Sequence, residues 1–548
     1  MPLLIDSDSE NGSDARTERG LELEPDGSQA SGASGLSLLT EDSGANVGGI
    51  WTDGCVAVNG LAVADGLEME VDSGSEPIEQ PWPQLHVSGS EMEESCEDSD
   101  HELQGALMTV PHEGWPLASD FTFSFTWAAR LWVTLKNMLG EERILSQLFS
   151  VPRVMSTHFS GLGTAEAALA MLAAAGRDIM RAELTCRFVF ACDTAPSCRW
   201  VLQQRLDGGC VYKGILDRFQ TANLPGCVRN GALDYVRAQS MLLTAPVTLG
   251  SPCSVHHGVC DLHPVDGDVS GSPCIPWSRA STKVIRGRQH PCVVVLLAWC
   301  AWVRCVRPSV AIHENVVGFD VAVLTEMLGD IYWIQHVRVS PSDMGFPFIR
   351  RPRLYSVLIR RAGARPPPDM QCMYAQIVDR MQYEVQPEVS AWAWRAPIDD
   401  LLQEENATRT LRGLSCVATP SGDWSYLLTE KQAMRLQTYQ QCARPGVDLA
   451  YVTYNLSQNP QFAGSTTGLP TFKRGSGRLW SPSRRRWLVR SERLAAMGYP
   501  VFQDLANAAR VPREEVALHG PAFAIGNAMH VANVGCLLAL AWLVIEPA

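Results

Sequence analysis

The chain has 548 residues, enough for two to four domains, and its apolar fraction of 46% is typical of soluble globular proteins. Its net charge of −14 is unevenly divided: residues 1–110 contain 24 acidic and two basic side chains, which leaves the remainder at +8. The longest apolar runs are too short to cross a bilayer, and no signal peptide opens the chain, so we expect neither a membrane-spanning nor a secreted protein. The 17 scattered cysteines predict reduced thiols in the nucleus or cytosol.

Residues 1–110 are rich in Ser, Gly, Asp and Glu. This composition cannot bury enough apolar surface to offset the entropy of ordering, so it predicts a disordered acidic tail. The tail is either a solvating segment or one that shields a basic body from a polyanion, and it could bind a protein partner.

From residue 111 onward, strand-like runs alternate with helical ones, which predicts a mostly parallel α/β sheet. The predicted strands are Phe188–Cys192, Val310–Ile312, Ile334–Val339 and Leu354–Ile359. The predicted helices are Thr164–Ala175, which ends at Gly176, then Cys292–Val306 and Val531–Val544. Ligands bind at the carboxyl ends of the strands in such sheets. Three prolines at 366–368 break the pattern and begin a less regular region.

A glycine-containing turn, Phe159-Ser160-Gly161-Leu162-Gly163, precedes the first of these helices. Its two glycines would let the backbone approach a ligand closely at a helix N-terminus. Asp193 ends the next strand, where a carboxylate either accepts ribose hydroxyls or caps the following helix.

The tetrapeptide GSPC occurs twice, and it ends at Cys253 and at Cys274. Prolines on both sides of Cys274 restrict the backbone and could orient its sulfur as a nucleophile; the alternative is a buried structural cysteine in a proline turn. Glu314 lies at the end of a predicted strand, where it is either a proton donor or a cap of the next helix. Arg351 and Arg353 lie at the start of another predicted strand. They either hold a phosphate or a carbonyl oxygen, or they belong to an exposed basic turn.

A basic tract lies near the end of the irregular region and alternates with Trp480 and Trp487. Such a pattern favours phosphate contacts with base stacking over a merely solvated surface. Its candidate nucleic-acid contacts are Lys473, Arg474, Arg478, Arg484, Arg485 and Arg486.

Six blocks occur in a fixed order: FSGLG, Asp193, PCIPWS, HENV, the arginine pair and GNAM. In this order they resemble the cytosine-5 methyltransferases. The resemblance implies a Rossmann-like S-adenosylmethionine-dependent methyltransferase domain over 111–365. It also implies a smaller target-recognition region over 366–488 and a C-terminal segment over 489–548 that returns to the catalytic domain.

The resemblance also implies a role for each matching residue. Cys274 would attack C6 of cytosine, Glu314 would hold N3, and Arg353 would hold O2, while Arg351 would orient the catalytic loop. The residues implied to contact S-adenosylmethionine are Phe159, Ser160, Gly161, Leu162 and Gly163 at its methionine part, Asp193 at its ribose, Pro273 beside it, and Asn527 and Ala528 at its carboxylate side.

Two positions depart from the family pattern, because Ile275 and Ile349 replace glutamines. An insert before Cys274 carries Cys253, His256, His257, Cys260 and His263, which either bind zinc or form a Cys/His-rich loop; we assign no metal. The long recognition region and the basic tract favour DNA as the substrate, and a nuclear location follows from that substrate. The alternatives are the same reaction on RNA, with the cytoplasm as location, and a non-catalytic nucleic-acid-binding protein.

Overall fold

The computed structural model describes residues 56–58, 61–63, 117–118 and 120–545, except for gaps at 207, 220–223, 279–283, 386–391, 442–451, 458–467, 473–477 and 514–521. The predicted acidic tail therefore lies outside the described residues, apart from two short strands. These are β1 (Val56–Val58) and β2 (Leu61–Val63), which pair antiparallel.

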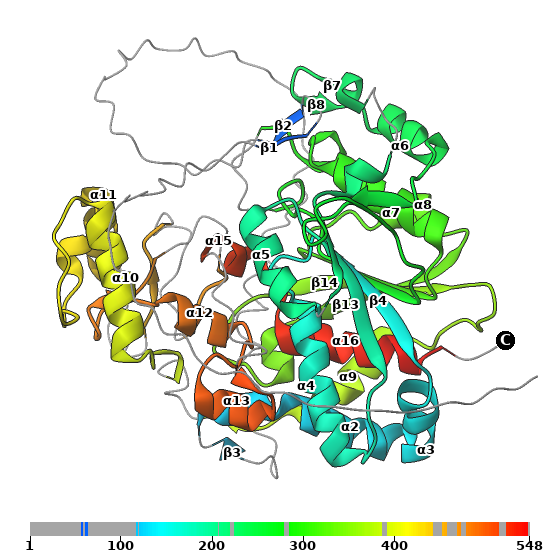
Figure 1. Ribbon diagram of the computed structural model, residues 1–548. Coiled ribbons are helices and arrows are strands. Elements are labelled where there is room, and N and C mark those ends of the chain that lie inside the picture. The colour runs from blue at the N-terminus through cyan, green and yellow to red at the C-terminus, as the bar shows by residue number, and fades with distance from the viewer. Residues whose placement is uncertain are drawn as a thin grey trace, which may run out of the picture. The chain divides into compact units, whose positions relative to one another are not determined.

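A seven-stranded sheet forms the centre of the protein, with the strand order β13-β14-β12-β11-β4-β5-β6 (Figure 1). Every strand is parallel to its neighbours except β14, which is antiparallel to both β12 and β13. The strands are β4 (Arg153–His158), β5 (Cys186–Cys192), β6 (Cys210–Tyr212), β11 (Gly267–Ser270), β12 (Val310–Asn315), β13 (Tyr332–Val339) and β14 (Arg353–Arg360). The predicted α/β, Rossmann-like fold class is confirmed. From β4 the chain adds strands first on one side, as β5 and β6, and then on the other side, beginning with β11; such sheets bind ligands at this change of direction.

Helices cover both faces of this sheet because successive strand residues point to opposite sides. Val310 and Ile312 belong to one core, whereas Ala311 between them belongs to the other. The first core is covered by α2 (Trp127–Leu139), α4 (Thr164–Ile179), α9 (Met370–Met381) and α16 (Val531–Leu543), and the second by α6 (Tyr235–Thr244), α7 (Val293–Val306) and α8 (Ala322–Leu328) (Figure 1).

The predicted end of α4 at Gly176 is wrong, because the helix continues to Ile179. Gly176 instead allows a close approach between helices: a Cβ at this position would lie 2.9 Å from Cε1 of Phe149. A glycine inside a helix thus serves packing here, although it resembles a C-terminal stop in the sequence.

The first core includes a helix that follows the three prolines. Helix α9 contributes Met370, Tyr374 and Ile377 to the first core and packs on β13 and α2. The region that follows has a small core of its own, centred on Trp424, Trp480 and other apolar side chains. Its elements are α10 (Ile398–Leu411), α11 (Glu430–Gln441), β16 (Tyr454–Asn455), β17 (Leu479–Ser481) and β18 (Arg486–Trp487).

Residues of the C-terminal segment pack in the first core. The segment contains α12 (Arg490–Ala496), α13 (Gln503–Ala509), α15 (Ala522–Asn527) and α16. The stretch Ala524–Leu543 is long and apolar enough to span a membrane by those criteria alone, but nearly all of it is buried inside the protein. Its apolar character is therefore accounted for by packing against α2 and α4.

Gly535 sets how closely α16 approaches α2, because a Cβ there would overlap the ring of the fully buried Trp127. We expect Gly535→Ala to lower the free energy of unfolding by about 1–3 kcal/mol, since overpacking outweighs the gain of about 1 kcal/mol in helix propensity. Gly422→Ala is the control, because a Cβ there meets nothing within 4 Å. Equal stability of both variants in denaturant unfolding would contradict this account.

Candidate active site

The turn between β4 and α4 has an open face at Gly161. Gly161 and Gly163 adopt positive φ angles of 56° and 68°, which favour glycine. A Cβ at Gly161 would meet nothing within 4 Å, whereas one at Gly163 would collide with Arg205. The two glycines therefore have different tasks: Gly163 allows a close approach within the protein, and Gly161 leaves room for a ligand.

Asp193 ties this turn to the end of β5. Its Oδ2 accepts a hydrogen bond from the Gly161 N–H at 2.9 Å, and its Oδ1 accepts one from the Ala195 N–H at 2.8 Å, at the start of α5 (Pro196–Arg205). The N-cap of α5 is Ala195 and it has no side-chain cap hydrogen bond, so Asp193 forms a local turn before the helix and does not cap it. A contact with ribose stays a prediction.

The side chains of Ser160 and Leu162 are buried inside the protein. Ser160 Oγ accepts from the Cys192 N–H at 3.2 Å, and the Leu162 carbonyl accepts from Arg205 Nε at 2.9 Å. These two residues therefore shape the turn, and any contact they make with a ligand would come from the backbone.

Seven of the nine predicted cofactor residues lie at the carboxyl ends of three adjacent strands, and the other two, Asn527 and Ala528, lie at the end of α15. Asp193 follows β5, the Phe159–Gly163 turn follows β4, and Pro273 follows β11, and these strands are neighbours in the order β5-β4-β11. Together with the open face of Gly161 and the N-terminus of α4, this arrangement fits S-adenosylmethionine.

A polar network fixes the loop that carries Cys274 to the neighbouring strand β12. Ser272 Oγ lies 2.8 Å from His313 Nε2, and Asn315 Nδ2 donates to Ser272 Oγ at 3.1 Å. After the cysteine, the N–H groups of Trp277 and Ser278 both donate to the Cys274 carbonyl. The half-buried Cys274 is therefore held in a turn that is anchored on both sides.

Glu314 and Arg353 form a buried ion pair, with Oε1 and Nε 2.9 Å apart. Their side chains are only 8% and 12% exposed. The other carboxylate oxygen faces the loop that carries Cys274, since a Cβ on Gly271 would lie 3.4 Å from Glu314 Oε2. The acid on β12, the arginine on β14 and the loop after β11 thus meet at one edge of the sheet.

The electrostatics of Cys274 show that these groups act on its thiol. Burial raises the pKa of Cys274, and the negative charge of Glu314 raises it further, whereas Arg353 and Arg351 lower it. The net pKa lies above the ordinary value of a cysteine. The thiol is therefore mostly protonated at neutral pH, and its thiolate fraction depends on the balance between one acid and two arginines.

Arg351 joins three segments that are distant in the sequence. It is buried, and its guanidinium donates to the carbonyls of Gly526 at 3.0 Å, Ala528 at 2.6 Å and Phe472 at 3.3 Å. Burial lowers the pKa of Arg351 to about 9. Arg351 therefore holds the C-terminal end of α15 and the residue that follows it, where the Asn527 side chain is exposed.

A segment of the predicted recognition region lies beside Arg351. The Arg350 N–H donates to the Leu469 carbonyl at 3.0 Å, and Ile349 and Leu469 form a parallel bridge. Ile349 is itself buried in the first core. An apolar side chain at this position, where the family has glutamine, therefore fits its surroundings.

The structure places the arginines of the predicted basic tract in different environments, some paired within the protein and some exposed. Lys473 and Arg474 lie outside the described residues. Arg478 stacks over Trp487 at 3.8 Å, and Arg486 pairs with the buried Glu492 at 2.7 and 2.8 Å, so both have contacts within the protein.

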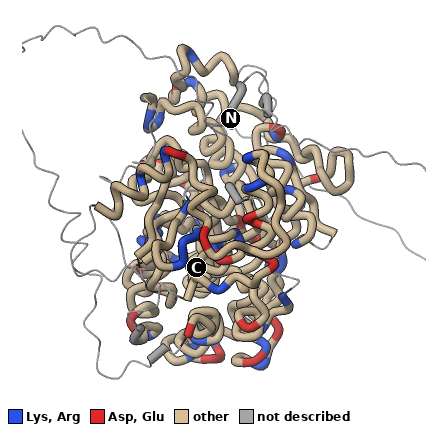
Figure 2. The backbone as a smooth tube through the Cα atoms, turned by 90° about the vertical axis from the view of Figure 1, so that its left-hand side faces the viewer, with Lys and Arg blue, Asp and Glu red and all other residues tan. Residues whose placement is uncertain are grey.

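Trp480 and Trp487 are each only 2% exposed, so the prediction that they stack on bases is wrong. Arg484 and Arg485 are exposed, although Arg485 forms an ion pair with Asp423. They remain candidates for phosphate contacts. In Figure 2, basic and acidic segments are interspersed over the side that faces the viewer.

A buried polar network beneath the site was not predicted from the sequence. His158 Nδ1 lies 2.7 Å from Asp268 Oδ1, its Nε2 lies 2.5 Å from the Arg218 guanidinium, and Trp299 donates to Asp268 Oδ2 at 2.8 Å. Burial lowers the pKa of His158. The network joins β4 to β11 below the two ligand-facing turns, and a histidine in the last position of a strand was its only signal in the sequence.

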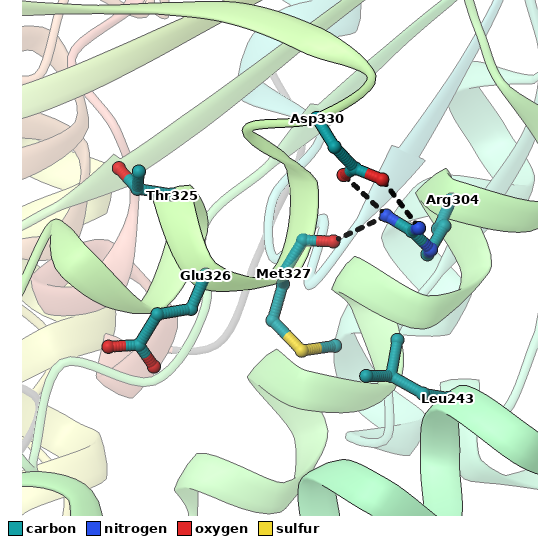
Figure 3. A pocket seen from close by; sticks show the side chains of 6 residues that line it. All are labelled: Leu243, Arg304, Thr325, Glu326, Met327 and Asp330. Atoms are coloured by element: carbon teal, nitrogen blue, oxygen red, sulfur yellow. Dashed lines mark hydrogen bonds and ion pairs between the residues drawn. The ribbon is translucent and has the colours of Figure 1, made fainter.

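A surface hollow of about 390 Å³ lies between α7 and α8, away from these residues (Figure 3). Its arginine is already paired: Arg304 donates to Asp330 at 2.6 Å and to the Met327 carbonyl at 3.1 Å. This hollow offers no unpaired group for a ligand's charge.

The chain matches no protein-family model and no curated protein. Among solved structures it is similar to the Dnmt2 methyltransferase of S. pombe, with 14% identity, a TM-score of 0.34, and coverage of 71% of this chain and 98% of that one. A putative DNA modification methyltransferase encoded within an E. coli prophage has 13% identity and a TM-score of 0.37, with coverage of 71% and 97%. The methyltransferase EhMeth of Entamoeba histolytica has 11% identity and a TM-score of 0.34, with coverage of 72% and 98%. At these values the overall likeness carries no argument about chemistry, which has to rest on the residues of this chain.

Proposed function

We propose that the protein transfers a methyl group from S-adenosylmethionine to C5 of cytosine in DNA. The observation that carries this proposal is the meeting of Cys274, Glu314 and Arg353 at one edge of the sheet, next to the turns that fit the cofactor. A nucleophile, an acid and a cation are the groups that covalent attack on a pyrimidine ring requires. S-adenosylmethionine, when bound, supplies the methyl group.

Cys274 begins the reaction as a thiolate that attacks C6 of the ring. Its sulfur forms a bond to C6, and the electrons of the C5–C6 double bond move to C5. Glu314 holds a proton at N3, which makes C6 electrophilic, and Arg353 holds O2. The ion pair between Glu314 and Arg353 keeps both groups on one side of the base before it arrives.

C5 then takes the methyl group, which would leave the cofactor as S-adenosylhomocysteine. C5 loses its proton to solvent, the electrons of that C–H bond restore the C5–C6 double bond, Cys274 leaves C6 as a thiolate, and the proton at N3 returns to Glu314. Because the target base lies inside a duplex, it has to leave the stack to reach Cys274. Arg351 stabilises this arrangement, because its hydrogen bonds tie the recognition region and the Gly526–Met529 segment to the strand that carries Arg353.

DNA is the proposed substrate because the predicted recognition region is long and has a small core of its own, and because its Leu469, which packs in the first core, pairs with Ile349 close to Arg351. Nuclear residence follows from this substrate, and the acidic tail is proposed to bind a protein partner. The same residues could act on RNA, so the substrate has to be tested directly.

The test is transfer of labelled methyl groups to three substrates: hemimethylated duplex DNA, unmethylated duplex DNA and tRNA. We expect incorporation into DNA at C5 of cytosine. Incorporation into tRNA alone would overturn the choice of DNA and leave the chemistry intact. Binding of nucleic acid with no methyl transfer to any of the three would favour the non-catalytic alternative.

A further inference from the structure

We propose that Cys210, Cys253, His256 and Cys260 bind a structural zinc ion that fastens a β-hairpin to the edge of the catalytic sheet. Their four ligand atoms all lie within 4.8 Å of one another. This cluster is separate from Cys274 and takes no part in the proposed reaction.

The ligands come from three elements. Cys210 lies on β6, the edge strand of the sheet. Cys253 directly follows β9 (Gly250–Pro252), Cys260 lies on the antiparallel partner β10 (Val259–Asp261), and His256 lies in the turn between them.

The distances match tetrahedral coordination. His256 Nδ1 lies 3.6 Å from the sulfur of Cys210, 3.5 Å from that of Cys253 and 3.2 Å from that of Cys260. A tetrahedral zinc ion with bonds of about 2.3 Å to sulfur and about 2.0 Å to nitrogen would separate these atoms by about 3.5 Å. One ring nitrogen cannot form three well-aligned hydrogen bonds, so a shared cation explains the arrangement better.

Hydrogen bonds hold the hairpin in place around the cluster. The Ser254 N–H donates to the Val211 carbonyl at 2.7 Å, and Tyr212 Oη donates to the Asp261 carbonyl at 2.9 Å. The Val255 N–H donates to the sulfur of Cys253 at 3.4 Å, a contact that favours a thiolate. Such outer contacts orient ligands before the ion binds.

The chemistry of the ligands selects the ion and its role. Three thiolates and one imidazole are soft ligands that favour zinc over magnesium or calcium. Four protein ligands leave no position for water or substrate, so the ion would be structural. It would also protect β6, because the clamped hairpin covers an otherwise open sheet edge.

The structure also corrects the set that the sequence spacing suggested. His257 and His263 are exposed and lie outside the cluster, and Cys210 takes their place from a different strand. These two histidines therefore provide matched controls within the same insert.

The first measurement is the metal content of the full chain, purified under reducing conditions without chelator, by elemental mass spectrometry. We expect about one zinc ion per chain, released when the thiols are modified. In Cys210→Ser and Cys260→Ser the zinc content should fall to near zero, whereas His257→Ala and His263→Ala should retain it.

A second measurement uses the wild-type protein, so it tests the proposal even if the variants fail to fold. Wild-type protein loaded with Co²⁺ in place of zinc should show thiolate-to-cobalt charge transfer and the visible bands of tetrahedral coordination. The proposal would be overturned if the wild-type protein bound neither zinc nor cobalt. It would also be overturned if Cys210→Ser retained the metal or if His257→Ala lost it. A disulfide among the three cysteines in freshly reduced protein, seen by mass spectrometry, would overturn it too.

Discussion

Cys274→Ser is expected to abolish the covalent adduct that the wild-type chain forms with DNA containing 5-fluorocytosine. A fluorine at C5 cannot leave as a proton does, so the bond between Cys274 and C6 persists and can be detected as a complex stable to denaturant. Serine is a far weaker nucleophile than a thiolate, and removal of a nucleophile costs roughly 10⁴-fold or more in rate. The measurement is the shifted band on a denaturing gel, together with mapping of the modified peptide.

Two cysteine variants serve as controls for this experiment. Cys253→Ser tests the other GSPC tetrapeptide, whose sulfur lies 3.5 Å from His256 Nδ1 in a separate cluster, and Cys305→Ser tests an exposed cysteine. Both should retain the adduct per folded molecule. Because the pKa of Cys274 is raised, wild-type adduct formation should accelerate as the pH rises from 7 toward 9. An adduct that survives in Cys274→Ser would refute its assignment as nucleophile.

Glu314→Gln is expected to change two rates of Cys274 in opposite directions. Adduct formation should fall by about 10²–10⁴-fold, because glutamine cannot supply a proton to N3. Alkylation of Cys274 by iodoacetamide should become faster when it is measured at pH 7.5. This pH lies about one unit below the ordinary pKa of a thiol, so the alkylation rate there follows the thiolate fraction. The reason is that burial raises the pKa of this thiol and Glu314 raises it further, so removal of the acid leaves Arg353 and Arg351 to lower it.

This pair of measurements separates catalysis from damage to the fold. A misfolded variant would also form the adduct more slowly and expose Cys274, but it would speed alkylation of the fully buried Cys300 and Cys536 as well. Faster alkylation confined to Cys274, together with a slower adduct, is therefore the expected signature of the lost charge. Glu326→Gln is the control, since Glu326 pairs with Arg288 at 2.9 Å outside the site, and both rates should stay unchanged. If alkylation of Cys274 is unchanged or slower in Glu314→Gln, the charge of Glu314 does not act on the thiol.

The sheet was predictable because its signals are local. Runs such as Phe188–Cys192 and Val310–Ile312 are apolar over a strand length, and each ends at a polar residue that the parallel arrangement brings to one edge. The order of the blocks then indicated which edge residues act together. The ion pair between Glu314 and Arg353 agrees with that grouping.

The errors arose where a residue's environment is set by distant segments. Trp480 and Trp487 looked like a stacking surface but belong to a small core with Trp424, and Arg478 and Arg486 turn inward to them and to Glu492. A basic aromatic pattern has the same appearance whether it faces solvent or a core. Cys210 was missed as a ligand for the same reason, because only the bridge between Tyr212 and Cys253 brings its strand to the hairpin.

The packing of α16 against α2 and α4 has a consequence for how the chain folds. The first core begins with helices near residue 127 and is completed by a helix that ends at residue 543, so its two sides are joined by contacts of very long sequence separation. Such contacts slow folding, because a large loop has to close before they form. During synthesis the apolar faces of α2 and α4 therefore stay exposed until the last helix leaves the ribosome. Nascent chains of this protein should need chaperones to keep them from aggregating until that point.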